Sequence, residues 1–327
     1  MEKSEVLKIV WELTRPSDLI LARRYLEFLE TVVATPKMQL YNCFPAPKKN
    51  GGNRIIYAAD KELRLVQIIL AYWITNHFPL GDDYCYHRGR GVFAAVKRHQ
   101  QSKFALVFDL KNAFESITSS MIEKRLKACF LEAGINVEEE AVAFIIDLLI
   151  VNGRTRQGCV SSPIIYNLVI KPLDDDLESL KNRFGSLVLT RYSDNICFSS
   201  AERIDFVRLE REISRVVKDY GFSLSWFKKF EGQPIVYLGT RIWRGKLALA
   251  PDKHLDFYDK ILEALQSPTP SIYRYQITGI LNWAYLVCGE DIPDDLASLF
   301  YRYFAKVGRT PKKLAETLAN RQQKKII

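Results

Sequence analysis

The sequence predicts an α+β fold, in which amphipathic helices are interspersed with pairs of short strands. Apolar residues recur at helical spacing over residues 6–34 and again over residues 61–77. Short runs of apolar and β-branched residues flank turn residues within 40–57 and 186–198, which indicates β-hairpins. The chain has 327 residues, 48% of them hydrophobic, and this suffices for a large core and more than one subdomain.

The net charge and the cysteine spacing limit which partners, metal sites and compartments are expected. Lys and Arg number 47 against 38 Asp and Glu, and the net charge of +9 suits a polyanionic partner such as nucleic acid. The six cysteines form no C-x-x-C pair, which argues against a zinc site and indicates a reducing compartment. No apolar run reaches membrane-spanning length, and the charged N-terminus lacks a signal-peptide core. We therefore expect a soluble, cytoplasmic protein with no membrane partner.

The N-terminal region predicts two packing helices followed by a basic hairpin. Ser17 or Asp18 can cap the second helix, because both side chains accept hydrogen bonds from helical amides. An Asn-Gly-Gly-Asn turn then places Lys48, Lys49 and Arg54 on neighbouring strands. Their charges either converge on a phosphate chain or simply form a solvated hairpin surface.

Two later segments carry residues suited to ligand contacts. Arg88 and Arg90 alternate with aromatic and glycine residues, a mixture that suits the backbone and bases of nucleic acid. Gly158 would let the main chain approach a ligand closely. Ser162 is the predicted N-cap of the helix that follows, which runs to about Leu180.

Two carboxylates stand at strand ends. Asp109 follows the apolar run 104–108, where a carboxylate is poorly solvated unless it is paired or bound to a metal. Asp194 stands in a hairpin turn between Ser193 and Asn195. A turn carboxylate is usually just solvated, and it becomes chemically significant only if a second carboxylate joins it. Asp109 is the candidate for that second group.

The rest of the chain continues the α+β pattern to its end. The expected elements are a helix over 202–220, a strand over 222–226 leading to Lys228, a strand over 236–243, helices from 252 onward interrupted by a linker at 267–270, and a basic tail at 321–325.

Taken together, these segments resemble the polymerase core of reverse transcriptases over roughly residues 44–290. Each motif alone is weak, but their common order and spacing make coincidence a poor explanation. The matching segments are Asp109 to Phe114, Gln157-Gly158 with Ser162-Pro163 and Asn167, Tyr192-Ser193-Asp194-Asn195, Lys228, and Leu238 to Ile242; upstream, Lys48 to Arg54 and Arg88 to Gly91 resemble the fingers of bacterial enzymes.

The resemblance implies a right-hand polymerase fold: N-terminal helices and fingers over 1–103, a palm with an antiparallel sheet over 104–250, and a small helical thumb with a basic tail over 251–327. It implies an RNA-directed DNA polymerase that adds deoxynucleotides to a primer 3′-hydroxyl by two-metal nucleotidyl transfer. The implied partners are an RNA template, a DNA or RNA primer and deoxynucleoside triphosphates. A free-standing bacterial lineage of the retron, group II intron-like or antiviral-defence type would add a cognate structured RNA and an accessory protein.

The resemblance also implies roles for single residues. Asp109, Asp194 and the backbone carbonyl of Leu110 would hold two Mg²⁺ ions, with Mn²⁺ as an alternative. Lys228 would donate a proton to the leaving pyrophosphate. The ring of Phe114 would lie under the incoming sugar and exclude a 2′-hydroxyl. The implied nucleotide-binding residues are Lys48, Lys49, Arg54, Phe114, Gln157 and Gly158, and the implied nucleic-acid-binding residues are Arg88, Arg90, Tyr192, Ser162, Asn282 and Trp283.

One catalytic position departs from the family pattern. The third motif usually ends in two aspartates, and here the second is Asn195, whose neutral oxygen lowers the charge of the site. Two other functions therefore stay open. One is a catalytically impaired pseudo-polymerase that binds nucleic acid or a partner, and the other is template-independent or protein-primed DNA synthesis in phage defence.

Overall fold

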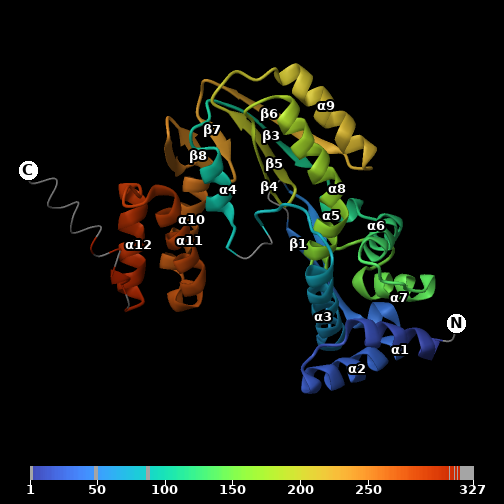
Figure 1. Cartoon of the computed structure of the whole chain (residues 1–327). Helices are drawn as coiled ribbons and strands as arrows, with labels where there is room; N and C mark the ends of the chain where they lie inside the picture. The colour runs from blue at the N-terminus through green and yellow to red at the C-terminus, as the bar shows by residue number, and fades with distance from the viewer. Residues whose placement is uncertain are drawn as a thin grey trace, which may run out of the picture. The chain divides into compact units, whose positions relative to one another are not determined.

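Helices and antiparallel strand pairs are interspersed along the chain, which confirms the predicted α+β class (Figure 1). The computed structural model describes residues 3–47, 51–85, 89–308, 310–312, 314 and 316. The chain forms two compact units that interleave in sequence. The first unit comprises Met1–Arg88, Phe108–Gly185 and Phe206–Phe227, and the second comprises Gly89–Val107, Ser186–Asp205 and Lys228–Ile327.

The first unit starts with helices and a two-stranded hairpin. Asp18 caps the second helix by accepting a hydrogen bond from the backbone N–H of Leu21 (2.7 Å), so the predicted break and cap are confirmed. Asp60 caps the third helix through Leu63 in the same way (2.8 Å). The elements are α1 (Lys3–Thr14), α2 (Leu19–Ala34), the 3₁₀ helix η1 (Lys37–Leu40), the antiparallel strands β1 (Tyr41–Pro47) and β2 (Asn53–Ala59), and α3 (Lys61–His77).

The remainder of the first unit is largely helical. Its helices are α5 (Ala113–Ser116), α6 (Ser119–Glu132), α7 (Glu139–Leu149), α8 (Ser162–Arg183) and α9 (Phe206–Asp219). The prediction of Ser162 as the N-cap of α8 is wrong by one residue, because α8 begins at Ser162 and Ser161 precedes it. The Ser162 hydroxyl donates instead to the backbone carbonyl of Arg156 (2.7 Å), and it thereby closes the preceding loop.

A proline interrupts the backbone hydrogen bonds of α8, and a side chain of α6 supplies the missing donor. Pro172 lies inside the helix and has no N–H, so the carbonyl of Leu168 lacks its usual donor four residues on. The Nε of Arg125 donates to that carbonyl (3.3 Å), and its Nη1 lies 3.4 Å from Glu132. Arg125 therefore attaches α6 to α8 at the one turn where the proline breaks the internal ladder.

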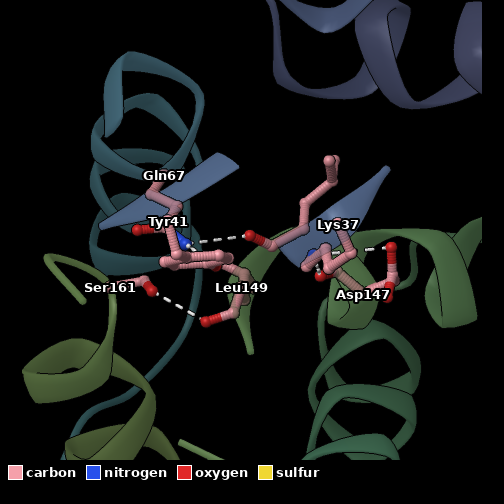
Figure 2. Close-up of polar contacts among 7 residues, drawn as sticks. Lys37, Tyr41, Gln67, Asp147, Leu149 and Ser161 are labelled. Atoms are coloured by element: carbon pink, nitrogen blue, oxygen red, sulfur yellow. Dashed lines mark hydrogen bonds and ion pairs between the residues drawn. The ribbon is translucent and has the colours of Figure 1, made fainter. Parts of the chain in front are cut away.

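The C-terminus of α7 is the anchor for the loop that follows it. The last four carbonyls of a helix have no partner within the helix, and here each one accepts from a different donor. Figure 2 shows the donors Lys37, Gln67 and Ser161. One of these donors, Lys37, also forms an ion pair with Asp147 at this end of the helix, where the helix dipole favours a cation. The donor–carbonyl pairs are the Ile150 N–H with Ile146 (3.2 Å), the Lys37 ammonium with Asp147, the Gln67 amide with Leu148 (3.1 Å) and the Ser161 hydroxyl with Leu149 (2.9 Å).

The second unit contains most of a four-stranded sheet with the order β4-β5-β3-β6. The predicted hairpin is confirmed, since β4 and β5 pair antiparallel with Tyr192 opposite Asn195. The N–H of Lys103 donates to the carbonyl of Ser200 (2.9 Å), so β3 begins where β5 ends. The elements are α4 (Val92–Arg98), β3 (Phe104–Leu110), β4 (Val188–Tyr192), β5 (Asn195–Ser200) and β6 (Leu224–Glu231); residues 108–110 and 224–227 belong to the first unit.

A second sheet, β7-β8-β9, follows, and it corrects one prediction. The single strand expected over 236–243 is divided into β7 (Ile235–Tyr237) and β8 (Thr240–Trp243), which pair with each other; β9 (Lys246–Leu249) completes the sheet. The chain reverses at Leu238 (φ +48°) and Gly239 (φ +71°). A Cβ on Gly239 would lie 3.0 Å from the ring of Trp283, so this close approach requires glycine.

The C-terminal part of the second unit is helical, as predicted, and appears in orange to red in Figure 1. The predicted linker at 267–270 connects the first of these helices to the next, and the hydroxyl of Tyr303 donates to the carbonyl of Pro270 (2.8 Å). The basic tail at 321–325 lies outside the described residues. Within the part of the chain that is described, no helix is both long and apolar enough to cross a membrane. The elements are α10 (Pro251–Gln266), η2 (Pro270–Tyr273), α11 (Arg274–Cys288) and α12 (Asp294–Lys306).

Candidate active site

The hairpin between β4 and β5 presents Asp194 in a two-residue turn. Ser193 and Asp194 lie between the paired residues Tyr192 and Asn195, and Ser193 has a positive φ of 56°. Such tight hairpin turns require a positive φ, which a small polar residue such as Ser tolerates better than a branched one. The Nη1 of Arg191, a buried side chain, donates to the carbonyl of Ser193 (3.1 Å). The turn is thus held from within the hairpin, and Asp194 is left half-buried.

Asn195, the departure from the family motif, acts directly on this carboxylate. Its side-chain Nδ2 donates a hydrogen bond to Oδ1 of Asp194 (3.1 Å). A donor to a carboxylate stabilises the ionised form. The amide therefore supports a charged Asp194, where an aspartate would add a second negative charge.

Asp109 occupies the penultimate position of β3 and belongs to the first unit. Most side chains of β3 are buried, and that of Leu110 is only 1% exposed. Asp109, in contrast, is half-buried. Immediately after the strand, Asn112 adopts the left-handed conformation (φ +48°) and starts the short helix α5. A side chain with a short polar group is well suited to this conformation. The motif thus turns the chain sharply after the carboxylate.

Phe114 lies on α5 and is half-buried. Its ring lies 5.2 Å from the ring of Tyr166 on α8 at an angle of 40°. The hydroxyl of Thr155 donates to the backbone carbonyl of Phe114. Thr155 and Tyr166 are both fully buried, so they hold the backbone and one side of the ring in place.

The loop with Gln157 and Gly158 is clamped onto strand β2. The N–H of Tyr57 donates to the carbonyl of Gln157 (2.8 Å), and the Sγ of Cys159 lies 3.7 Å from the carbonyl of Tyr57. The guanidinium of Arg156 lies over the Tyr57 ring, 5.5 Å from its centroid. Burial raises the pKa of Cys159 to about 11, so this residue contributes a neutral thiol.

Gly158 is required by this clamp. Its φ is +99°, and a Cβ there would lie 2.6 Å from Ile56 and 2.8 Å from the carbonyl oxygen of Tyr57. The close approach that was expected toward a ligand is made to β2. Beside it, the Oε1 of Gln157 is buried and accepts no hydrogen bond from the described residues. A buried acceptor without a donor is costly, and it marks this amide as a group able to receive a ligand.

The remaining predicted site residues lie in varied environments. Arg54 on β2, Lys228 on β6, Arg90 and Asn282 are exposed, and Tyr192 is half-buried at the end of β4. Trp283 is half-buried against the turn at Gly239, with its indole N–H buried. Lys48, Lys49 and Arg88 lie outside the described residues. The first unit contains Asp109, Phe114, Gln157 and Gly158, and the second contains Asp194, Asn195 and Lys228.

Sequence reasoning did not anticipate two buried polar residues beside these motifs. Thr155 stands three residues before Gly158, and its hydroxyl bonds to the Phe114 backbone. His99 directly follows α4 and is fully buried between polar side chains of β4 and β5. A lone polar residue has no periodic signal, so only its position next to a buried strand could have indicated its burial.

Comparison with known proteins agrees with the motifs. The family model described as "Reverse transcriptase (RNA-dependent DNA polymerase)" matches residues 46–242. The retron Ec73 reverse transcriptase of Escherichia coli is 26% identical over 283 residues, covering 80% of this chain and 86% of that one. The retron Ec48 reverse transcriptase of E. coli is 23% identical over 66% of this chain and 56% of its own length, and the Mx65 enzyme of Myxococcus xanthus is 25% identical over 58% and 47%. The chain thus spans about half the length of these last two relatives.

Among solved structures, apo telomerase from Candida tropicalis has a TM-score of 0.46 at 11% identity, over 66% of this chain and 56% of that one. This likeness is too distant to carry an argument. The family match, in contrast, covers more than half of the chain, and it coincides with the strands and loops described above. The chain belongs to the reverse transcriptase family, and its helices and antiparallel sheets form that family's α+β polymerase fold.

Proposed function

We propose that this protein is an RNA-directed DNA polymerase that adds deoxynucleotides to a primer 3′-hydroxyl. The observation that carries the proposal is the family match over residues 46–242, which contains both motif carboxylates at strand ends. Asp194 immediately precedes β5, and Asp109 lies on β3. We infer that these two carboxylates together bind divalent cations, for which hard oxygen ligands are suited.

The donor chemistry fits Mg²⁺ or Mn²⁺. Both carboxylates are half-buried hard-oxygen donors, and the Leu110 carbonyl would add a third. No group of three or more His, Cys, Asp or Glu side chains that could hold a metal occurs among the described residues. Two carboxylates would therefore need oxygens from the triphosphate and water to complete the ion's shell. When bound, two such ions supply activation of the primer hydroxyl and stabilisation of the leaving pyrophosphate.

The other residues would bind and orient the substrates. The orphaned Oε1 of Gln157 would accept a hydrogen bond from the nucleotide or template, and Gly158 keeps this loop against β2. Phe114, supported by Tyr166, would exclude the 2′-hydroxyl of a ribonucleotide. Arg54 and Lys228 are exposed, so their charges carry no desolvation penalty, and they would bind the triphosphate. Lys228 would also donate a proton to the leaving pyrophosphate.

The partners follow from the same chemistry and from the named relatives. The substrates would be an RNA template, a DNA or RNA primer and deoxynucleoside triphosphates. Because several relatives are retron reverse transcriptases, we also propose a cognate structured RNA that serves as template and primer, and a retron-type role in antiviral defence. Sequencing of nucleic acid that co-purifies with the protein tests this part, and random host RNA would contradict it.

Primer extension tests the activity itself. The purified protein is given a labelled primer on an RNA or a DNA template, with Mg²⁺ or Mn²⁺, and the Asp194→Asn variant serves as the control. Template-directed DNA from the wild type alone supports the proposal. Product without a template, or product sensitive to protease, would instead indicate template-independent or protein-primed synthesis.

Asn195 is the specific observation that favours a second candidate, a pseudo-polymerase. Its amide engages one oxygen of Asp194, which leaves that oxygen less available to a cation. Tight binding of a primer–template without extension under any metal condition would establish this second function.

A further inference from the structure

A chain of hydrogen bonds within the second unit ends at Asn195, the residue that follows the Ser193–Asp194 turn. It passes through His99, which is fully buried just after α4. The Nε2 of His99 lies 2.7 Å from the Oγ1 of Thr190 on β4. Thr190 donates to the hydroxyl of Tyr237 on β7 (3.2 Å), and Tyr237 donates to the backbone carbonyl of Asn195 (3.4 Å).

The same chain continues on the other side of the imidazole. The Nδ1 of His99 lies 2.6 Å from the Oγ of Ser199 on β5, and that oxygen lies 2.7 Å from the Oγ of Ser102. We refer to Ser102, Ser199, His99, Thr190 and Tyr237 as the His99 relay. Its members come from three separate parts of the sequence, and Thr190, Ser199, Tyr237 and His99 are each at most 2% exposed.

The donors and acceptors of the His99 relay allow one direction only. The Tyr237 hydroxyl donates to the carbonyl of Asn195, and the Thr190 hydroxyl donates to Tyr237. The Thr190 oxygen must therefore accept a hydrogen bond from His99. A neutral imidazole has one donor and one acceptor. With Nε2 as the donor, Nδ1 accepts from Ser199, which accepts in turn from Ser102. Every link is satisfied by neutral His99 as the Nε2–H tautomer.

Burial favours this neutral form. It lowers the pKa of His99 to about 3, with a smaller contribution from the charge of Arg98. The aromatic contact fits the same arrangement, since the rings of His99 and Tyr237 meet edge-on at 5.5 Å. A protonated ring would make Nδ1 a donor, and the Ser199 hydroxyl would then have to donate to Ser102 instead.

We propose that the His99 relay fixes the position of the Ser193–Asp194 turn through the carbonyl of Asn195, and that His99, Thr190 and Tyr237 are positioning residues for nucleotidyl transfer. The carbonyl that ends the relay belongs to the residue directly after Asp194. A shift at this carbonyl would move the end of β5 to which the two-residue turn is directly attached. The catalytic part of this inference rests on the proposed polymerase function.

The chain offers a matched set of variants. Thr190→Val and Tyr237→Phe each remove one relay hydroxyl while they keep the volume of the side chain. Thr240→Val makes the same change at a second fully buried threonine, whose hydroxyl has no hydrogen-bond partner among the described residues. Thr240 lies opposite Tyr237 in the β7–β8 pair, so the control tests the same region outside the relay.

The first measurement is amide hydrogen exchange of the unliganded full chain, read over residues 188–200. We expect both relay variants to accelerate exchange at the turn by about tenfold, the scale of one lost hydrogen bond, and Thr240→Val to leave it unchanged. We expect the double variant Thr190→Val/Tyr237→Phe to match the single variants, because either change breaks the same chain. Unchanged exchange in folded relay variants, or additive effects, would overturn the proposal.

The second measurement is primer extension against Mg²⁺ concentration. Misplacement of Asp194 should lower kcat by about tenfold and raise the Mg²⁺ concentration for half-maximal rate, with KM for the nucleotide little changed. Wild-type rates in both relay variants would overturn the catalytic role even if exchange increased. An inactive wild type would contradict the polymerase proposal instead, while the exchange measurement still decides whether the relay holds the turn.

Discussion

The side-chain amide of Asn195 donates a hydrogen bond to the carboxylate of Asp194 across 3.1 Å. Asn195 is therefore a donor to its neighbour, as well as a neutral residue at a position where the family usually has a second aspartate. This contact decides between two expectations for the Asn195→Asp variant. A merely weakened cation position would gain from the extra charge, whereas a required donor would be lost.

We expect Asn195→Asp to lower activity at low Mg²⁺ and to recover it at high Mg²⁺. Without a cation, two carboxylates side by side repel each other, which raises the pKa of the pair and destabilises the protein at neutral pH. Stability should return as the pH falls through that raised pKa. The rate of primer extension as a function of Mg²⁺ concentration tests the activity. Thermal unfolding without metal between pH 5 and pH 8 tests the stability. Asn195→Ala, which removes the donor without adding charge, is the control, and higher activity of Asn195→Asp at low Mg²⁺ would contradict the donor role.

We expect Asp109→Asn and Asp194→Asn each to abolish DNA synthesis while the fold is retained. The change removes charge but keeps shape, so a cation loses a ligand and packing is conserved. Circular dichroism and primer extension measure the two properties. Asp252→Asn, at an exposed position in the first turn of α10, is the control. Full activity in either site variant sinks the assignment of these carboxylates.

We expect Phe114→Val to reduce discrimination against ribonucleotides by at least about tenfold, which corresponds to about 1.4 kcal/mol in the transition state. The smaller side chain opens the space that the ring would fill below the sugar. Single-nucleotide incorporation with each sugar on one primer–template gives the ratio of kcat/KM values. Phe114→Tyr keeps the ring and should retain the selectivity. An unchanged ratio in an active Phe114→Val protein would make Phe114 an ordinary packing residue against Tyr166.

We expect Gly158→Ala to destabilise the first unit by at least about 2 kcal/mol, because the methyl group meets backbone atoms of β2 at a strained positive φ. Denaturant unfolding measures the loss. Gly185→Ala is a useful comparison, since its φ is also positive (+87°) but a Cβ there meets no atom within 4 Å. Equal losses in the two variants would show that backbone strain alone acts at Gly158, without the close approach to Tyr57.

We expect His99 to make the protein sensitive to acid. Its pKa lies at about 3 in the folded chain against an ordinary value of 6.5, so the unfolded chain binds the proton first. The stabilisation is complete above pH 6.5 and is lost as the pH falls toward 3, by about 1.4 kcal/mol per pH unit for one proton. Unfolding free energies of the wild type and His99→Gln across this range give the difference in slope. Parallel curves would show that the pKa of His99 is not lowered in the folded chain.

The local elements of this protein could be read from its sequence, because short-range chemistry decides them. Asp18 caps α2 through an amide three residues away, and the turn at Asp194 is favoured by its own small polar neighbours. The order of the polymerase motifs is likewise a property of the chain, and it predicted the family that the comparison shows.

Tertiary structure decided the features that depend on distant partners. Residues 236–243 read as one strand, but Gly239 turns the chain where it meets Trp283, a contact across 44 residues that no local pattern encodes. Ser162 has the composition of an N-cap, yet its hydroxyl bonds to Arg156. The burial of His99 depends on hydroxyl partners about 90 to 100 residues away on β4 and β5. Side-chain periodicity reports which face of an element is buried, but it does not report which polar groups meet there, and that is why only the folded chain reveals them.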